Sequence, residues 1–175
     1  AVLCGDLAPA GRLPMSFPRA TGQVPVFYNH ATTGRPEMVD YRDLTRDPLF
    51  TFGYGLTYTS FKFGPVKIIA PAKPGQPAVA RASVTNTGKR AGETVAQLYI
   101  RDVACSEGAR PSQELRGWQR LSLTPGETRA VEFTLDDAAL GFVDRQGRHR
   151  VEPGEFRVWI APQAGTGDAA KYQHL

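Results

Sequence analysis

Residues 94–101 have the sequence TVAQLYIR, in which apolar and polar side chains alternate. Ala96, Leu98 and Ile100 fall on one face of an extended chain, and the residues between them fall on the other. A period of two is typical of a strand that is buried on one side. The stretch therefore predicts a half-buried β-strand.

Similar short patterns occur on both sides of this stretch. They cover residues 66–69, 78–85, 114–123, 129–135, 142–144, 149–152 and 156–160. Turn sequences separate them, such as TPGE at 124–127, where proline presets φ and glycine accepts the positive φ of a type II turn. About seven short strands predict a mainly β chain with an immunoglobulin-like or fibronectin type III-like β-sandwich.

The alternation slips in one of these strands. Leu115, Leu121 and Leu123 share one face, whereas Trp118 falls on the opposite face. A glycine inside a strand often marks a bulge, and a bulge at Gly117 would return Trp118 to the core. We therefore expect a bulged strand with Trp118 among the core residues.

Residues 1–65 show little periodicity of either kind. Prolines spread along residues 9–48 preclude long regular elements there: Pro9, Pro14, Pro18, Pro25, Pro36 and Pro48. Apolar side chains such as Phe17, Phe27 and Phe52 have no pattern that would bury them within the segment. We expect the segment to lie against another part of the protein.

Charge and composition argue against several classes of protein. The net charge is +4, but the basic residues are scattered. The densest cluster (Arg145, Arg148 and Arg150) has Asp144 and Glu152 beside it, which indicates a solvated turn and no nucleic-acid surface. No apolar run approaches the roughly 18 residues that would predict a membrane-spanning helix.

The N-terminal residues and the cysteines give little information about function. The first six residues, AVLCGD, lack the basic and apolar regions of a signal peptide, so we expect the chain to begin within a domain. Cys4 and Cys105 lie in different predicted units, and no Cys/His spacing suggests zinc. We expect free thiols, with no metal site and no cofactor.

Motifs along the whole chain resemble glycoside hydrolase family 3 β-glucosidases, in particular the bacterial periplasmic subgroup. Those similar to the end of that family's second domain are GRLPMSFPR at 11–19, GQVPVFYNH at 22–30 and TGRP at 33–36. Residues 49–61 resemble the link to its third domain. Those similar to its fibronectin type III-like domain are VTNTG at 84–88, AGETVAQLY at 91–99, LRGW at 115–118 and LTPGE at 123–127.

The resemblance implies a division into three parts. Residues 1–48 would be the C-terminal remnant of an α/β sandwich domain, 49–65 a linker, and 66–175 the fibronectin type III-like domain. The parent enzyme would be a retaining, exo-acting β-glucosidase of the periplasm or the secreted fraction, and the sandwich would support its catalytic domains.

The resemblance also implies that no residue of this chain is catalytic. Glycoside hydrolysis uses two carboxyl groups, and the family places its nucleophile in an N-terminal barrel and its acid/base glutamate earlier in the second domain. The carboxylates of the first segment are expected to be solvated or locally paired: Asp6, Glu37, Asp40, Asp43 and Asp47. The chain alone is therefore expected to be inactive, and its partners would be the remaining domains and, through them, a β-glucoside or oligosaccharide.

Two groups of residues are candidates for a binding role. The polar and aromatic loop residues Tyr28, Asn29, His30 and Arg35 are of the kind that lines sugar sites, and the resemblance places their loop near the parent's substrate. Tyr99 and Trp159 fall on outer strand faces, where we expect exposed aromatics that contact another domain.

Two other functions stay open. One is a carbohydrate-binding sandwich that acts through Trp118 or Trp159. The other is a free-standing protein-interaction module, because the fold alone does not fix the function.

Overall fold

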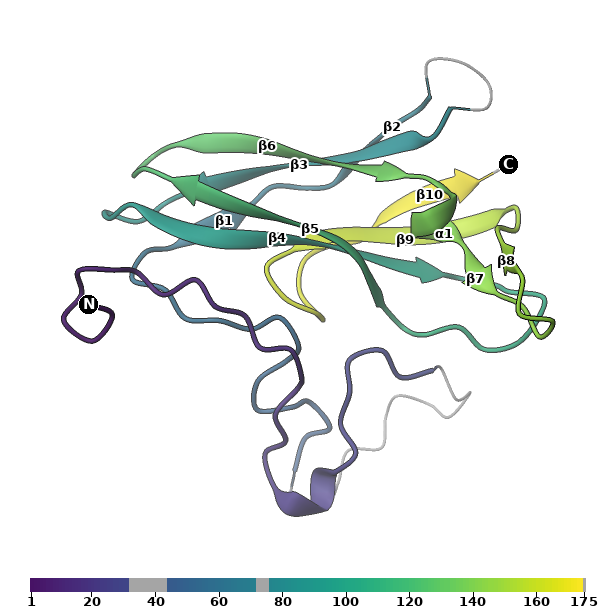
Figure 1. Cartoon of the computed structure of the whole chain (residues 1–175), viewed down its shortest axis with the longest axis horizontal. Coiled ribbons are helices and arrows are strands. Elements are labelled where there is room, and N and C mark those ends of the chain that lie inside the picture. Colours follow the sequence, from purple (N-terminus) through teal and green to yellow (C-terminus); the bar gives the residue numbers. More distant parts are fainter. Residues whose placement is uncertain (32–43, 72–75, 175) are drawn as a thin grey trace.

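Two antiparallel sheets pack face to face and form a β-sandwich (Figure 1). The structure is a computed structural model that describes residues 1–31, 44–71 and 76–174. One sheet has the strand order β10-β9-β4-β5. These strands are β4 (Gly92–Asp102), β5 (Glu114–Leu123), β9 (Gly154–Ala161) and β10 (Ala170–His174).

The other sheet is built around β3 (Ala78–Asn86). β6 (Thr128–Leu135) pairs with one edge of β3, while β1 (Phe61–Phe63) and β2 (Lys67–Ile69) pair with successive parts of the other edge. A helical turn, α1 (Asp137–Leu140), follows β6 and leads into the hairpin of β7 (Phe142–Val143) and β8 (His149–Arg150). The predicted fold class is confirmed.

The core lies between the two sheets. Ala96, Leu98 and Ile100 are all at most 3% exposed, as their alternation in β4 predicts. Across the sandwich they face the small side chains and valine of β3 and the apolar residues of β6, and the apolar residues of β9 lie beside them in the same sheet. The remaining core members include Ala80, Val84, Val131, Leu135, Phe156 and Val158.

The bulge in β5 is present, but Trp118 is not in the core. Arg116 is the extra residue where the register to β4 shifts. Because of it, Leu115 and Trp118 both lie on the outer face of the sheet, and Gly117 faces the core between them. Phe133 fills the space inside, since a Cβ at position 117 would lie 3.1 Å from its ring. Trp118 is therefore 65% exposed, and the prediction that it is buried is wrong.

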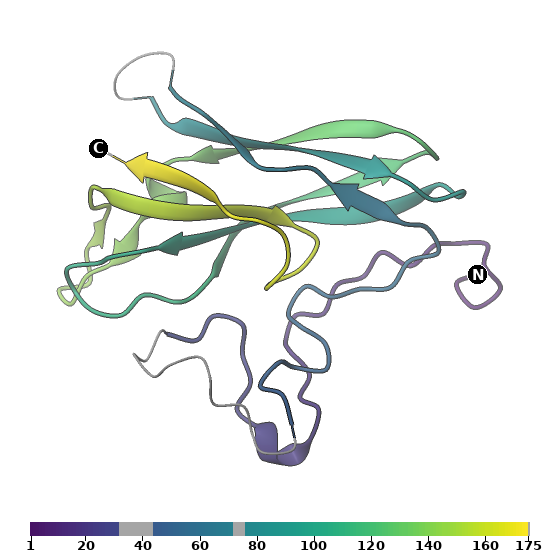
Figure 2. The same ribbon diagram turned by 180° about the vertical axis from the view of Figure 1, so that it is seen from behind.

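Residues 1–31 and 44–60 form an irregular segment, here named the strap, whose two halves run side by side along the outer face of the β10-β9-β4-β5 sheet (Figures 1 and 2). Its regular structure is limited to the 3₁₀ turn η1 (Thr21–Gln23) and isolated bridges. The segment thus lies against another part of the protein, as its unpatterned apolar residues led us to expect, and that part is the sandwich.

Backbone hydrogen bonds join the two halves of the strap. The Leu13 N–H donates to the Tyr54 carbonyl (2.8 Å), and the Gly53 N–H donates to the Leu13 carbonyl (2.9 Å). Further along, the Phe17 N–H donates to the Phe50 carbonyl (2.8 Å). These bonds satisfy backbone groups that no regular sheet pairs.

Three further expectations concern the cysteines, membrane-spanning helices and the linker. Cys4 and Cys105 are free thiols, as predicted. Within the described ranges, no helix has the length and apolar character needed to cross a bilayer. The strand β1 falls inside the range expected to be a linker, while the three-part division itself stays a prediction.

Asp144 closes the hairpin between β7 and β8. Its carboxylate accepts hydrogen bonds from the backbone N–H groups of Arg148 (2.8 Å) and Gln146 (2.9 Å) and from Nε of Arg148 (3.1 Å). Gly147 completes the turn with φ +76°. The bond from the Arg148 backbone is the main reason that the pKa of Asp144 is lowered, although burial of the side chain opposes it.

We expect part of the stability to be lost at acid pH through Asp144. A carboxyl with a lowered pKa in the folded state stabilises the protein above its unfolded pKa of about 3.9, and this contribution disappears as the pH falls through the lowered folded value. The Tm difference between the native chain and Asp144→Asn should therefore shrink between about pH 5 and pH 2. Thermal unfolding followed by circular dichroism measures it. The exposed Asp168 provides the control, and an equal pH dependence for Asp168→Asn would contradict the prediction.

Candidate functional site

A cleft of about 580 Å³ lies between the strap and the outer face of β4 and β9. Tyr28 and His30 line it from the strap, and Arg101 and Trp159 line it from the sheet. Asp47, from the second half of the strap, completes the charged part of the wall. The cleft thus brings together three residues that the sequence marked as candidates, although they come from both predicted units.

Tyr28 is held by the sandwich. Its ring stacks on Phe52, with centroids 4.2 Å apart and planes at 17°, and meets Tyr99 edge-on at 5.9 Å. Its hydroxyl accepts a hydrogen bond from the Leu115 N–H (3.2 Å). Its carbonyl accepts another from the Ser112 hydroxyl (3.2 Å). Tyr28 is therefore an anchor that fixes where the following loop residues lie.

Asn29 and His30 follow Tyr28 in the chain, and both are exposed. The His30 carbonyl accepts a hydrogen bond from the Ser112 N–H (2.9 Å), and Ala31 forms an isolated bridge with Pro111. The His30 side chain lines the cleft, whereas Asn29 is exposed outside its lining. The fourth predicted member of this loop, Arg35, lies outside the described residues.

Tyr99 lies beneath the strap. It was expected to be exposed, and that expectation is wrong, since its exposed fraction is 0%. Burial, and secondarily the nearby Tyr28, raise the pKa of the Tyr99 hydroxyl. That hydroxyl donates to Oε1 of Gln97 at 2.6 Å. Trp159 pairs with Tyr99 across β9 and β4, and stays partly exposed as a wall of the cleft.

Three polar anchors of the strap were missed from the sequence, and two of them join it to the sandwich. Gln97 donates through Nε2 to the Pro162 carbonyl (2.6 Å), and the same nitrogen lies 3.4 Å from the Gly53 carbonyl. Arg12 donates to the Thr94 hydroxyl (2.8 Å). Gln97 and Thr94 lie in one strand but on opposite faces of it, and the alternation of β4 does not show which residues contact either side chain.

The third anchor, Gln23, organises the far end of the strap. Its Nε2 donates to the carbonyls of Arg46 (2.9 Å) and Asp47 (3.0 Å), and its Oε1 accepts from the Arg19 N–H (2.7 Å). Buried amides of this kind are common where irregular backbone needs hydrogen-bond partners. The residue lies in a segment without periodicity, so no sequence signal identifies it.

The cleft offers binding groups but few carboxylates. Among the described residues of its lining, Asp47 is the one carboxylate, whereas glycoside hydrolysis uses two. Glu37, Asp40 and Asp43 lie outside the described residues. No cluster of three or more His, Cys, Asp or Glu side chains suited to a metal ion occurs in the described ranges. The geometry suits contact with a polar ligand through aromatic, imidazole and guanidinium groups.

The fold and the strap define a fibronectin type III-like sandwich joined to the end of another domain. Residues 94–164 match the fibronectin type III-like domain model, and residues 1–58 match the model of the glycosyl hydrolase family 3 C-terminal domain. The chain belongs to glycoside hydrolase family 3 and corresponds to the C-terminal part of its members.

Similar proteins include the periplasmic beta-glucosidase of Salmonella typhimurium, which is 44% identical over 99% of this chain and 24% of its own length. A beta-xylosidase of Formosa agariphila is 40% identical over 95% of this chain and 23% of its own. A solved β-glucosidase from Erythrobacter marinus superimposes with a TM-score of 0.89 at 39% identity, over 98% of this chain and 22% of that one. The chain thus spans about a quarter of the length of these relatives.

Proposed function

We propose that the chain is the C-terminal structural portion of a retaining, exo-acting β-glucosidase that hydrolyses terminal non-reducing β-D-glucosyl residues. Its role is to support the catalytic domains, and it has no turnover alone. The observation that carries this proposal is the docking of the strap, which matches one family domain, on the sandwich, which matches another. The contacts of Arg12 with Thr94 and of Tyr28 with Tyr99 link the two.

The apolar surface of the strap supports the same role. The structure has fifteen large apolar residues that are exposed among those described, and eleven of them lie in the strap. They are Val2, Leu3, Leu7, Met15, Phe17, Val24, Phe27, Leu49, Phe50, Leu56 and Tyr58. Exposed apolar side chains that gather on one segment mark an interaction surface. In the proposed enzyme, the remaining domains cover it.

The finer assignments follow from the same proposal. Residues 1–48 belong to the α/β sandwich domain, 49–65 to the linker and 66–175 to the fibronectin type III-like domain. The loop with Tyr28, Asn29, His30 and Arg35 approaches the bound β-glucoside or oligosaccharide. The periplasmic name of the Salmonella relative supports a periplasmic or secreted location.

Activity assays on two proteins test the proposal. One is the chain alone, and the other is a chimera in which the chain replaces the matching C-terminal quarter of the Salmonella relative. With nitrophenyl β-glucoside we expect turnover by the chimera and none by the chain, because the family resemblance places the carboxyl pair of the reaction outside this chain. The Salmonella protein without its C-terminal quarter is the control. Nitrophenyl β-xyloside is assayed in parallel. Turnover by the isolated chain contradicts the proposal, and so does a chimera that cleaves the xyloside but not the glucoside.

A further inference from the structure

A second hollow, here named the apolar groove, lies beside the strap at the β5 edge of the sandwich. It has a volume of about 340 Å³. Leu13 and Pro14 of the strap form one wall, and Val95, Leu115 and Trp118 of the sheet form the other. Its members therefore come from both family domains that the chain matches.

We propose that the apolar groove is a docking site for an apolar segment from the part of the family 3 protein outside this chain, with Trp118 as its central contact. The inference rests on the proposed function, because it takes the chain to work while joined to the remaining domains. It adds the surface, the central residue and the chemistry of the segment that binds there.

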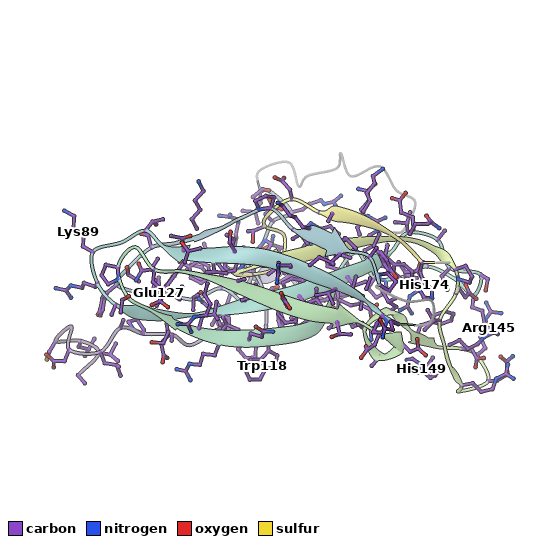
Figure 3. The ribbon with its side chains drawn as sticks, turned by 90° about the horizontal axis from the view of Figure 1, so that it is seen from above. Lys89, Trp118, Glu127, Arg145, His149 and His174 are labelled. Carbon is purple, nitrogen blue, oxygen red and sulfur yellow. The ribbon has the colours of Figure 1, made fainter. Side chains whose placement is uncertain are left out.

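Trp118 is placed for contact with a partner. It lies on the edge strand β5 and projects away from the sandwich (Figure 3). Its side chain is 65% exposed, whereas its neighbour across the strands, Gln97, is buried. An exposed tryptophan beside an apolar hollow has the features of a residue that dominates an interface once covered.

The groove is continuous with the contact between strap and sandwich. Phe52 lines the groove and also stacks on Tyr28 deeper in that contact. Arg12 crosses from the strap to the sheet, where it donates to Thr94. A segment bound in the groove would therefore extend an interface that already joins the two family domains.

Hydrogen bonding in the groove favours a peptide segment over a sugar. The amide of Gln97 is already engaged by Tyr99 and the Pro162 carbonyl, and Arg120 at the rim is paired with Glu93. Sugar recognition needs several free, fixed donors and acceptors beside the aromatic ring.

One polar atom in the lining of the groove lacks a hydrogen-bond partner among the described residues. Nε of Arg12 is buried without a hydrogen-bond partner in the described structure, and burial lowers the pKa of this side chain. A buried donor of this kind is costly unless it is satisfied. The docked segment should therefore present an apolar side chain to Trp118 and a carbonyl or carboxylate oxygen beside the accessible part of the Arg12 guanidinium.

Hydroxyl-radical footprinting of the isolated chain and of the chimera tests the proposal. The oxidation rate of Trp118 should fall at least about fivefold in the chimera, since a mostly exposed ring becomes an interface centre. Val143, which is 67% exposed on the hairpin, should keep its rate and serves as the control. A folded, active chimera in which Trp118 reacts as in the isolated chain overturns the inference and leaves the proposed function standing. Protection of Trp118 in a chimera that has no glucosidase activity supports the inference but not the proposed function.

A pair of matched variants gives a second measurement. Trp118→Ser should lower the Tm of the chimera but not that of the isolated chain, and Val143→Ser should change neither. If the chimera does not fold, the Tm measurement is replaced by a binding assay. It measures binding of the isolated chain to the separately produced N-terminal part of the Salmonella relative. Trp118→Ser should then weaken binding about tenfold or more. An absence of binding, or binding that Trp118→Ser leaves unchanged, overturns the inference.

Two other ligands of the apolar groove, a sugar and a second copy of the chain, are tested on the isolated chain. Cello-oligosaccharides that quench tryptophan fluorescence in the Trp159→Phe variant, but not when Trp118 is also replaced, would assign the groove to a sugar. A concentration-dependent dimer that Trp118→Ser dissolves would assign it to a second copy of the chain. Either result overturns the proposal, and a monomer that shows no saturable quenching agrees with it.

Discussion

Replacing Asn86 with alanine is expected to lower the free energy of unfolding by about 4 kcal/mol, out of the roughly 5–15 kcal/mol that holds a domain folded. Asn86 ends β3, and its side chain is fully buried. Its Oδ1 accepts from the Thr59 hydroxyl (2.7 Å) and the Gly88 N–H (3.0 Å). Its Nδ2 donates to the carbonyls of Arg90 (2.8 Å) and Leu123 (2.9 Å). The amide thus makes four hydrogen bonds.

Alanine would leave these four partners without their bonds. Three of them are backbone groups, and each one that stays buried without a partner costs about 1–3 kcal/mol. The space vacated by the amide adds a cavity cost. Because the partners lie at the end of the strap, in the β3–β4 turn and at the end of β5, the loss affects three parts of the molecule together.

Urea unfolding measures the effect of Asn86→Ala as a shift of the midpoint at constant slope. Thr85→Ala is the matched control, since Thr85 lies next in the chain and its hydroxyl bonds Thr128 at the surface. We expect the control to stay within about 0.5 kcal/mol of the native chain. Losses of equal size in the two variants would show that the buried amide has no special role.

The parts of the fold that the sequence predicts are those in which local pattern and burial coincide. The alternation in β4 places Leu98 and Ile100 in the core, and TPGE at 124–127 forms a turn with Gly126 at φ +77°. The short helical turn α1 is equally local, with the Asp136 side chain accepting a hydrogen bond from the Ala139 N–H. Each of these features depends on neighbours within a few residues.

The candidate site depends on contacts between distant residues, and those leave little trace in the sequence. Arg12 and Thr94 are 82 positions apart, and Tyr28 and Leu115 are 87 apart. The exposure of Tyr99 was misjudged because its own strand does not show that the strap covers it. The error at Trp118 has the same origin. The pattern locates the bulge, but a ring on the opposite sheet determines which residue faces inward.

The anchoring of the strap gives the second large expected effect. Gly53→Ala should release the strap from the sheet at a cost of about 3 kcal/mol. Gly53 has φ +81°, where a side chain costs about 1–2 kcal/mol, and an added Cβ would lie 2.5 Å from Oε1 of Gln97. Gln97 cannot swing away without losing its bonds to Tyr99 and to the Pro162 carbonyl. The substitution therefore breaks the polar contact that holds the strap over β4.

Hydrogen exchange distinguishes release of the strap from unfolding of the sandwich. In Gly53→Ala the Leu13 amide, which bonds the Tyr54 carbonyl, should exchange about 100-fold faster, because each tenfold corresponds to about 1.4 kcal/mol. The amides of β4 that pair with β5 should stay protected. Gly126→Ala measures the cost of a positive φ without a contact, and Gly11→Ala, with neither feature, should resemble the native chain. If Gly53→Ala speeds exchange at Leu13 by no more than Gly11→Ala does, the contact with Gln97 does not hold the strap in place.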